Sequence, residues 1–241
     1  MSKEVSLIIP NYKTFELTKL CLEYLEKNTD LDRVEVIVVD NNSADESLEY
    51  LKTVPYIHLL ERDPKDEHGP RMHIEALKLA LEHVTSPLVL VMHTDTIMIH
   101  PGWLDFLLEK INADPEIAAV GSWKLEYVPL LKRYYQRLET AIRRKLGRKV
   151  VDREHYFRSH CALYKTDLVR QAGGFEDDVS AGYCIFAKLR SQGYKLPFIE
   201  SAELCKYLMH LNHATGLLHA PLSERKGKRR KLFAQLKSLK G

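Results

Sequence analysis

Four short runs of β-branched and apolar residues, each of strand length, set the fold expected of this 241-residue chain. The runs are residues 5–9, 34–39, 57–60 and 88–92. Helical patterns lie between them, at residues 17–27, 45–53 and 72–84. Strands that alternate with helices predict an α/β fold in which helices cover both faces of a mostly parallel sheet.

Polar residues follow three of these expected strands. They are residues 11–12, 40–43 and 93–96. In open α/β sheets, ligands bind at the carboxyl ends of the strands. We therefore expect the three polar segments to face one crevice and to form a binding site.

The second half of the sequence is less regular. A helix is expected to begin at Pro101, because proline is common in the first helical turn. A long helix is expected within residues 121–153, a turn at Gly173–Gly174 and a helix at residues 185–192. Short strands are expected at residues 160–164, 196–199 and 204–210. The length of the chain suits one large domain.

Six segments carry a resemblance to a known family, and they occur in the family's order. They are residues 5–12, 35–45, 68–69, 101–104, 173–175 and 189–194. Together they resemble the family 2 glycosyltransferases over about residues 4–215. The resemblance implies a GT-A (Rossmann-like) sheet flanked by helices on both faces in a single domain.

This resemblance also implies a division of the chain. Residues 1–221 would form the glycosyltransferase domain, with 1–96 as the nucleotide-sugar-binding half and 97–221 as the acceptor-side half. Residues 222–241 would form a basic tail. The implied activity is transfer of a sugar from a nucleotide-sugar donor to a lipid-linked or polysaccharide acceptor, in cell-surface glycan synthesis. The implied enzyme is an inverting, metal-dependent hexosyl- or deoxyhexosyltransferase.

Donor-binding residues are transferred from the family to matching positions. Asp40, with Asn42 in the same polar segment, would hold the base or ribose, although Asp40 could instead cap a helix. Pro10 and Tyr12 would form the wall beside the base, and Tyr12 could equally be a packed surface aromatic. Arg71 is a candidate phosphate contact or an ordinary surface arginine.

A divalent cation, Mn²⁺ or Mg²⁺, is implied because the departing diphosphate concentrates negative charge. The family's Asp-x-Asp-like triplet corresponds here to His93-Thr94-Asp95, in which histidine replaces the first carboxylate. Asp95 matches the metal ligand, whereas His93 could bind the metal or hydrogen-bond the ribose. His210 matches a late histidine ligand, with His213 and His219 as rivals.

The general base is the point at which this sequence departs from the family. Inverting members use a carboxylate from an acidic pair, and the corresponding positions here are Ala181 and Gly182. The nearest carboxylates are just upstream. Asp178, or otherwise Asp177, is therefore the candidate catalytic base, and the alternative is that both are turn residues.

The net charge is only +3, but two segments, residues 132–149 and 225–240, hold most of the basic excess. Basic residues interleaved with apolar ones are typical of attachment to an anionic membrane surface, and a solvated helix and tail are the alternative. Nucleic-acid binding suits only the tail, so no nucleic-acid partner is expected. No apolar segment approaches the ~20 residues of a membrane span, and no signal-peptide pattern is present. We expect a cytoplasmic enzyme that can lie on the inner face of the membrane.

Two other functions compete with sugar transfer. A non-catalytic protein that binds nucleotide-sugars on the same fold would explain the missing acidic pair. A dinucleotide-dependent oxidoreductase is disfavoured, because no GxGxxG follows the first expected strand.

Overall fold

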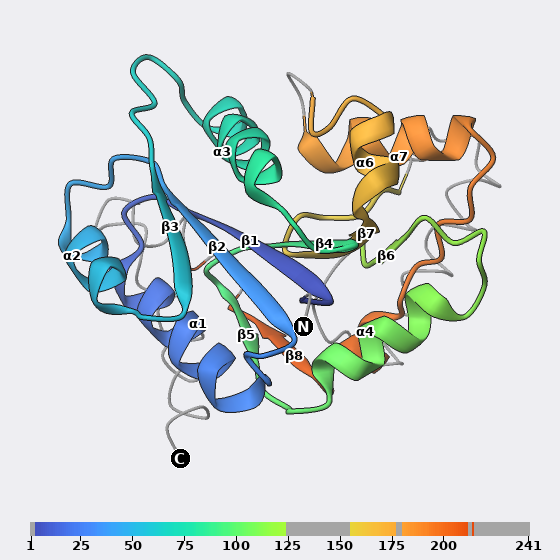
Figure 1. Cartoon of the computed structure of the whole chain (residues 1–241), viewed down its shortest axis with the longest axis horizontal. Coiled ribbons are helices and arrows are strands. Elements are labelled where there is room, and N and C mark those ends of the chain that lie inside the picture. The colour runs from blue at the N-terminus through green and yellow to red at the C-terminus, as the bar shows by residue number, and fades with distance from the viewer. Residues whose placement is uncertain (1–2, 124–154, 177–179, 212–213, 215–241) are drawn as a thin grey trace, which may run out of the picture.

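A six-stranded sheet forms the centre of the molecule in the computed structural model, which describes residues 3–123, 155–176, 180–211 and 214 (Figure 1). The strands are β1 (Val5–Asn11), β2 (Val34–Asp40), β3 (Ile57–Glu61), β4 (Leu88–Met92), β6 (Ala119–Gly121) and β7 (Cys161–Lys165). Their order is β3-β2-β1-β4-β7-β6. The first four strands are parallel, whereas β7 runs antiparallel to both β4 and β6. The expected α/β fold with a mostly parallel sheet is confirmed.

Helices cover both faces of the sheet, as Figure 1 shows for α3, α6 and α7 on one side and α1 and α4 on the other. Their bounds are α1 (Phe15–Asn28), α3 (Pro70–His83), α4 (Trp103–Asn112), α6 (Thr166–Gln171) and α7 (Ala181–Ser191). Side chains along β1 alternate between the two layers: Leu7 and Ile9 pack with α1 and α4, and Ile8 packs with α3. This alternation follows from the two-residue period of a strand, and it buries the β-branched runs on both sides.

A second, two-stranded sheet lies beside the main one. It pairs β5 (Thr96–Met98) with β8 (Leu208–His210) in antiparallel orientation. Thr96 lies opposite His210 in this ladder. The pairing therefore brings a residue from late in the chain next to the polar segment that follows β4.

Several boundaries differ from the expectations. The helix expected to begin at Pro101 begins at Trp103, with Gly102 as its N-cap. The strand expected at residues 196–199 is wrong, because only isolated bridges such as Gly121–Phe198 form there. Pro197 has no N–H to donate to a ladder, which is a physical reason for this interruption.

The strand expected at residues 204–210 is reduced to β8, because the helical turn α8 (Ser201–Leu204) and a turn after it take up its first part. The other short helix, α2 (Glu46–Thr53), is capped by the side chain of Asp45, which accepts a hydrogen bond from Ser47 N at 2.9 Å. The long helix expected within residues 121–153 falls almost entirely on residues 124–154, outside the described residues. None of the helices in the described part of the chain has the length and apolarity needed to cross a membrane.

Candidate functional site

A cavity of about 210 Å³ opens at the carboxyl ends of β1 and β4. These strands are adjacent in the sheet, and the chain order reverses between them, which is where open α/β sheets bind ligands. The cavity is also bordered by the residue after β2 and by the start of α3. Its lining residues are Pro10, Asn11, Tyr12, Thr14, Asn41, Gly69, Met72, His73, His93 and Thr94. Of the predicted donor-binding residues, Pro10, Tyr12, His93 and Thr94 line this cavity.

Asp40 lies beneath the cavity wall and is 1% exposed. One carboxylate oxygen, Oδ1, accepts from Asn11 Nδ2 at 2.6 Å and from Ser43 Oγ at 2.5 Å. The other, Oδ2, accepts from the Ser43 backbone N at 3.0 Å. Asp40 therefore holds the loop after β2 against the end of β1, and it does not cap α2. Its proposed contact with a base or ribose stays a prediction.

The hydroxyl and amide groups around Asn11 extend this network. Asn11 Oδ1 accepts hydrogen bonds from Thr14 Oγ1 at 2.8 Å and from Thr18 Oγ1 at 2.7 Å. Thr14 Oγ1 also lies 3.2 Å from Thr94 Oγ1, which connects the end of β1 to the end of β4. Thr94 was predicted as a donor-binding residue and Asn11 belongs to a polar segment expected at the site, whereas Thr14 and Thr18 were not predicted. The i, i+4 spacing of the two threonines at the start of a helix, directly after Asn11, was the available signal.

Arg62 fixes the loop between β3 and α3. Its guanidinium donates to Asn41 Oδ1 at 2.7 Å, to Glu67 Oε2 at 2.5 Å and to the Met72 carbonyl at 3.3 Å. Asn41 Nδ2 in turn donates to the Asn11 carbonyl at 3.1 Å. Both the oxygen and the nitrogen of the Asn41 side-chain amide are thus fixed by hydrogen bonds. Arg62, which was not predicted as a site residue, holds two residues that line the cavity, Asn41 and Met72.

Asp95 lies at the end of β4 with its side chain 7% exposed, next to two histidines. Its Oδ1 atom is 3.3 Å from His210 Nε2 and 3.9 Å from His93 Nδ1. Burial raises the pKa of the Asp95 carboxyl, but the hydrogen bond from His210 and the nearby His93 lower it more, so the net pKa lies below its usual range. Asp95 is therefore an ionised carboxylate at neutral pH.

Two further histidines complete a row across the site. The ring of His160 lies 5.1 Å from that of His210, and the ring of His73 lies 5.1 Å from that of His93. Burial, followed by the charges of His210 and His93, lowers the pKa of His160 to about 3, while burial and His93 lower the pKa of His73 to about 3. Both rings are therefore neutral at pH 7. Neither was predicted, because no spacing in the sequence shows that residues 73 and 160 approach residues 93 and 210.

Asp95 and His210 offer an oxygen and a nitrogen donor close together, a ligand combination that suits Mn²⁺. Among the described residues, no group of three or more such side chains is arranged to hold a metal ion. Metals that bind substrate phosphates commonly take only one or two protein ligands and leave the other positions to phosphate and water. The residues present fit a site of that kind.

The remaining predicted residues lie away from the cavity or outside the described residues. Asn42 and Arg71 are exposed and do not line the cavity, and Asn42 adopts a φ of 54°. Asp177 and Asp178 lie outside the described residues, as do His213 and His219 and most of the two basic segments. Their roles stay predictions.

Packing at the start of α7 restricts one of the two positions, residue 182, at which inverting relatives carry an acidic pair. A Cβ atom added to Gly182 would lie 2.2 Å from the carbonyl oxygen of Phe157, so no side chain fits there without backbone movement. The glycine permits close approach of α7 to the segment before β7. A carboxylate cannot occupy position 182 in this arrangement.

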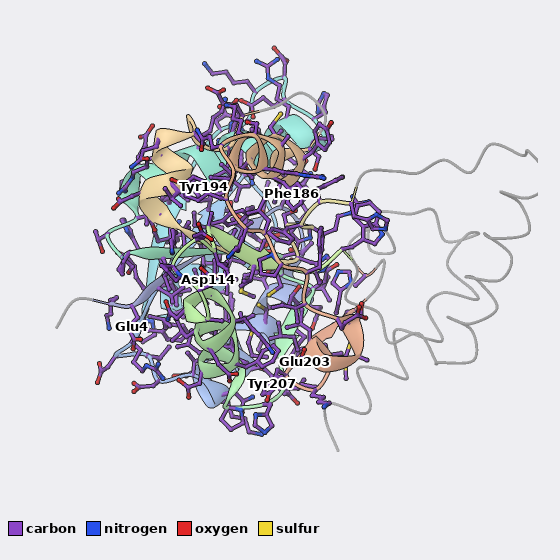
Figure 2. The ribbon with its side chains drawn as sticks, turned by 90° about the vertical axis from the view of Figure 1, so that its right-hand side faces the viewer. Glu4, Asp114, Phe186, Tyr194, Glu203 and Tyr207 are labelled. Carbon is purple, nitrogen blue, oxygen red and sulfur yellow. The ribbon has the colours of Figure 1, made fainter. Side chains whose placement is uncertain are left out.

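A second cavity, of about 390 Å³, is bordered by α7 and the segment that follows it. Phe186 and Tyr194, both labelled in Figure 2, are two of its lining residues. The cavity is lined by His155, Phe186, Arg190, Tyr194, Leu196 and Phe198. It shares no lining residue with the cavity at the strand ends, so the two are separate sites.

Solved structures similar to this chain are GT-A glycosyltransferases. The mannosyltransferase PcManGT from Pyrobaculum calidifontis, in complex with GDP-Man and Mn²⁺, is 24% identical with a TM-score of 0.60, over 83% of this chain and 55% of that one. S. aureus TarS 1-349 is 18% identical with a TM-score of 0.56, over 95% and 69%. Glucosyl-3-phosphoglycerate synthase from Mycobacterium tuberculosis, in complex with phosphoglyceric acid, is 18% identical with a TM-score of 0.55, over 99% and 80%. The chain thus has the GT-A fold, and it spans only about half of the mannosyltransferase chain that it resembles.

The family follows from the sequence itself. The model of glycosyl transferase family 2 matches residues 6–173, which is more than half of the chain. The protein therefore belongs to glycosyl transferase family 2, and the resemblance inferred from six segments is confirmed. A search of curated proteins finds no relative that matches this sequence.

Proposed function

We propose that this protein is a metal-dependent, inverting hexosyl- or deoxyhexosyltransferase that moves a sugar from a nucleotide-sugar to a lipid-linked or polysaccharide acceptor. The observation that carries the proposal is the Asp95–His210 pair, 3.3 Å apart, beside a cavity at the carboxyl ends of β1 and β4. A family 2 chain with this arrangement has a place for a nucleoside next to a place for a cation. In the proposed enzyme the first would hold the nucleoside of the donor and the second the cation beside its diphosphate.

The nucleoside is proposed to enter the cavity against Pro10 and Tyr12, with Asp40 and Asn42 in the loop after β2 holding the base or ribose. The rigid hydrogen bonds around Asp40 and Asn41 support this assignment, because a preorganised wall loses little conformational entropy on binding. Arg71, exposed at the start of α3, is proposed to reach the phosphates. His93 and Thr94, on the opposite wall, would face the ribose or sugar.

Asp95 and His210 are proposed to hold Mn²⁺ or Mg²⁺. The ion would offset the negative charge that grows on the diphosphate as the donor bond breaks. Two of the similar structures support a divalent cation, since PcManGT holds GDP-Man and Mn²⁺ and glucosyl-3-phosphoglycerate synthase holds Mn²⁺ and UDP. His93, with Nδ1 at 3.9 Å from Asp95, is an additional candidate for this site.

A carboxylate is still required to accept the proton of the attacking hydroxyl. We assign it to Asp178 or, failing that, Asp177, a few residues after the Gly173–Gly174 turn. The acceptor oxygen would form a bond to the anomeric carbon as the bond from that carbon to the phosphate oxygen breaks. The nucleoside diphosphate would leave with the bonding electrons, and the hydroxyl proton would pass to the aspartate.

The proposed location is the cytoplasm, with attachment to the anionic inner face of the membrane through the basic segments at residues 132–149 and 225–240. Each base near such a surface adds about 1 kcal/mol of attraction. A lipid-linked acceptor for a cell-surface glycan would be found there. Outside these two segments the chain has more acidic than basic residues, so the proposed attraction to an anionic surface is confined to them.

A non-catalytic protein that binds nucleotide-sugars is the second candidate function. The close approach of Gly182 to the Phe157 carbonyl favours it, because the second of the two positions of the usual acidic pair cannot carry a side chain. Such a protein would use the same cavity and the same Asp95–His210 pair. It would bind the donor without breaking it.

The experiment is a thermal-shift screen of nucleotide-sugars with and without Mn²⁺, followed by measurement of nucleoside diphosphate release from each ligand that binds. We expect Mn²⁺-dependent binding and slow release by the parent protein. Asp95→Asn should reduce the Mn²⁺-dependent affinity by roughly 10- to 100-fold or more. Mutation of residues that only hydrogen-bond to metal ligands typically costs that much, and loss of a ligand should cost at least the same. Asp114→Asn, in the loop after α4 and paired with Lys195, is the matched control. Binding without any turnover, with every acceptor class tested, would favour the non-catalytic candidate, and Mn²⁺-dependent binding by Asp95→Asn at the parent affinity would contradict the metal assignment.

A further inference from the structure

Arg158 lies in a corner formed by two aromatic rings. Its guanidinium carbon lies 4.4 Å from the ring centroid of Trp123 and 4.9 Å from that of Tyr156. The two rings meet edge to face, with centroids 5.3 Å apart and an angle of 78° between their planes. The Arg158 backbone N also donates to the Ser122 carbonyl at 3.0 Å, which ties this segment to the residue after β6.

The hydrogen-bonding edge of this guanidinium is not engaged by the described part of the chain. Within residues 3–123, 155–176, 180–211 and 214, no hydrogen bond or ion pair involves the Arg158 side chain. Cation–π attraction to the rings does not require the N–H groups of the guanidinium as hydrogen-bond donors to the rings. The rings also restrict the long side chain, so less conformational entropy is lost when a ligand binds.

The corner adjoins the donor site without being part of the cavity. Ser159, the next residue, has its Oγ 2.8 Å from His93 Nε2, and His160 Nε2 lies 3.0 Å from Ser122 Oγ. None of Arg158, Trp123 and Tyr156 lines the cavity at the strand ends.

We propose that Arg158, held between Trp123 and Tyr156, binds a phosphate group that lies outside the nucleoside cavity. A planar guanidinium whose N–H groups have no partner among the described residues can meet two phosphate oxygens at once, in a bidentate contact. The phosphate has two possible sources, the diphosphate of the donor or a phosphate on the acceptor. The inference rests on the proposed transferase function for its biological role, although phosphate binding can be measured without turnover.

The test compares the parent protein with Arg158→Gln, Arg158→Lys and Trp123→Leu by titration calorimetry in the presence of Mn²⁺. The donor arm uses pyrophosphate, UDP and GDP, with uridine and guanosine as phosphate-free ligands. The acceptor arm adds glycerol 3-phosphate to protein saturated with UDP or GDP. Lys206→Ala removes an exposed charge elsewhere and is the control, and thermal melts verify that each variant is folded.

Arg158→Gln should weaken binding of the phosphate ligand by roughly 10- to 100-fold, the effect of losing a charged hydrogen-bond pair, and leave nucleosides unaffected. Arg158→Lys should weaken binding less than Arg158→Gln does. Lysine keeps the positive charge but lacks the planar set of N–H donors that makes a bidentate contact. Trp123→Leu should give an intermediate loss. If Arg158→Gln weakens binding of pyrophosphate, UDP and GDP, the phosphate that Arg158 binds is the diphosphate of the donor. If it weakens binding of glycerol 3-phosphate alone, that phosphate belongs to the acceptor.

Unchanged affinity of Arg158→Gln in both arms would overturn the inference and leave the proposed function intact. An equal loss in Lys206→Ala would also overturn it, because the effect would then be one of net charge. If pyrophosphate binds in an Arg158-dependent way but no nucleotide binds, the proposed function fails and the inference stands. A parent protein that binds no phosphate ligand at all contradicts both.

Discussion

The carboxylate of Asp40 accepts three hydrogen bonds at a position where it is 1% exposed. Such a group both shapes the site and stabilises the fold, because its removal leaves the Asn11 amide and the Ser43 N–H without their acceptor. Residues of this kind cannot be assigned to binding or to stability from sequence alone. Each contribution has to be measured.

Asp40→Ala should lower the free energy of unfolding by about 1–3 kcal/mol, since buried donors lose their partner. It should also weaken free nucleoside diphosphate and the intact donor by the same factor, because the lost contacts are remote from the sugar. Urea denaturation and calorimetry measure the two effects. Asp30→Ala, at an exposed turn in which the Asp30 side chain accepts from the Asp32 backbone N, is the control. A loss confined to sugar-bearing ligands would contradict the assignment.

Asp177→Asn and Asp178→Asn test the general base. One of them should reduce kcat by roughly 10²-fold or more, with donor affinity nearly unchanged, because the proton moves only in the transition state. Steady-state kinetics and donor titrations measure the two quantities separately. If both variants transfer sugar at the parent rate, another group or the acceptor itself takes the proton.

His73 makes stability depend on pH. Its folded pKa of about 3 lies below the ordinary value of 6.5, because the ring is buried and His93 lies beside it. Between pH 6.5 and 3 the unfolded chain binds a proton that the folded protein does not. Stability should therefore fall on acidification through this window, by at most ~1.4 kcal/mol per pH unit from this histidine.

His73→Asn should make this decline shallower. The free energy of unfolding, measured by denaturant titration in steps across the window, gives the slope. His68→Asn changes an exposed histidine in the preceding turn and serves as the control. An identical slope in the parent and in His73→Asn would show that His73 is not the group responsible.

At the scale of elements, α7 is positioned by its close approach to the segment before β7. A Cβ atom placed at residue 182 would lie 2.2 Å from the Phe157 carbonyl oxygen, which leaves no room for any side chain. The aromatic cluster of Phe157 with Phe186 and Phe198, whose rings lie 5.0 and 4.8 Å from that of Phe157, depends on the same approach. This packing explains why residue 182, the second position of the usual acidic pair, is glycine here.

Gly182→Ala should therefore destabilise the protein by roughly 1–3 kcal/mol, the usual cost of overpacking a filled site. Thermal melting of the variant measures the loss. Ser191→Ala, at the exposed end of the same helix, should have little effect. A Gly182→Ala variant as stable as the parent would mean that α7 can move away from Phe157 without cost.

At the scale of the whole molecule, the uneven distribution of basic residues predicts where the protein lies in the cell. Deletion of residues 225–241 should reduce co-sedimentation with anionic vesicles and leave the weak interaction with neutral vesicles unchanged. Each basic residue lost removes about 1 kcal/mol of surface attraction at low salt. Equal binding by the truncated protein at low salt would exclude the tail from membrane attachment.

Local sequence determined most of the sheet. The runs at β1, β2 and β4 were visible because fully buried parallel strands are continuous β-branched segments. Asp95 was singled out because it matches the family's Asp-x-Asp-like triplet after the fourth expected strand. The three-residue strands β5 and β6 were not predicted, since three residues carry no detectable period. The strand expected across residues 196–199 failed because Pro197, which is visible in the sequence, has no N–H to donate to a ladder.

Tertiary structure alone decided which polar residues meet. His210 reaches Asp95 because β8 pairs with β5, and His160 reaches the same row because β7 inserts antiparallel beside β4. Arg62 and Arg158 acquired their roles from contacts between segments far apart in the chain. Sequence patterns report the local period of a helix or strand, whereas these contacts depend on the pairing of strands that are distant in sequence, and no local pattern encodes that pairing.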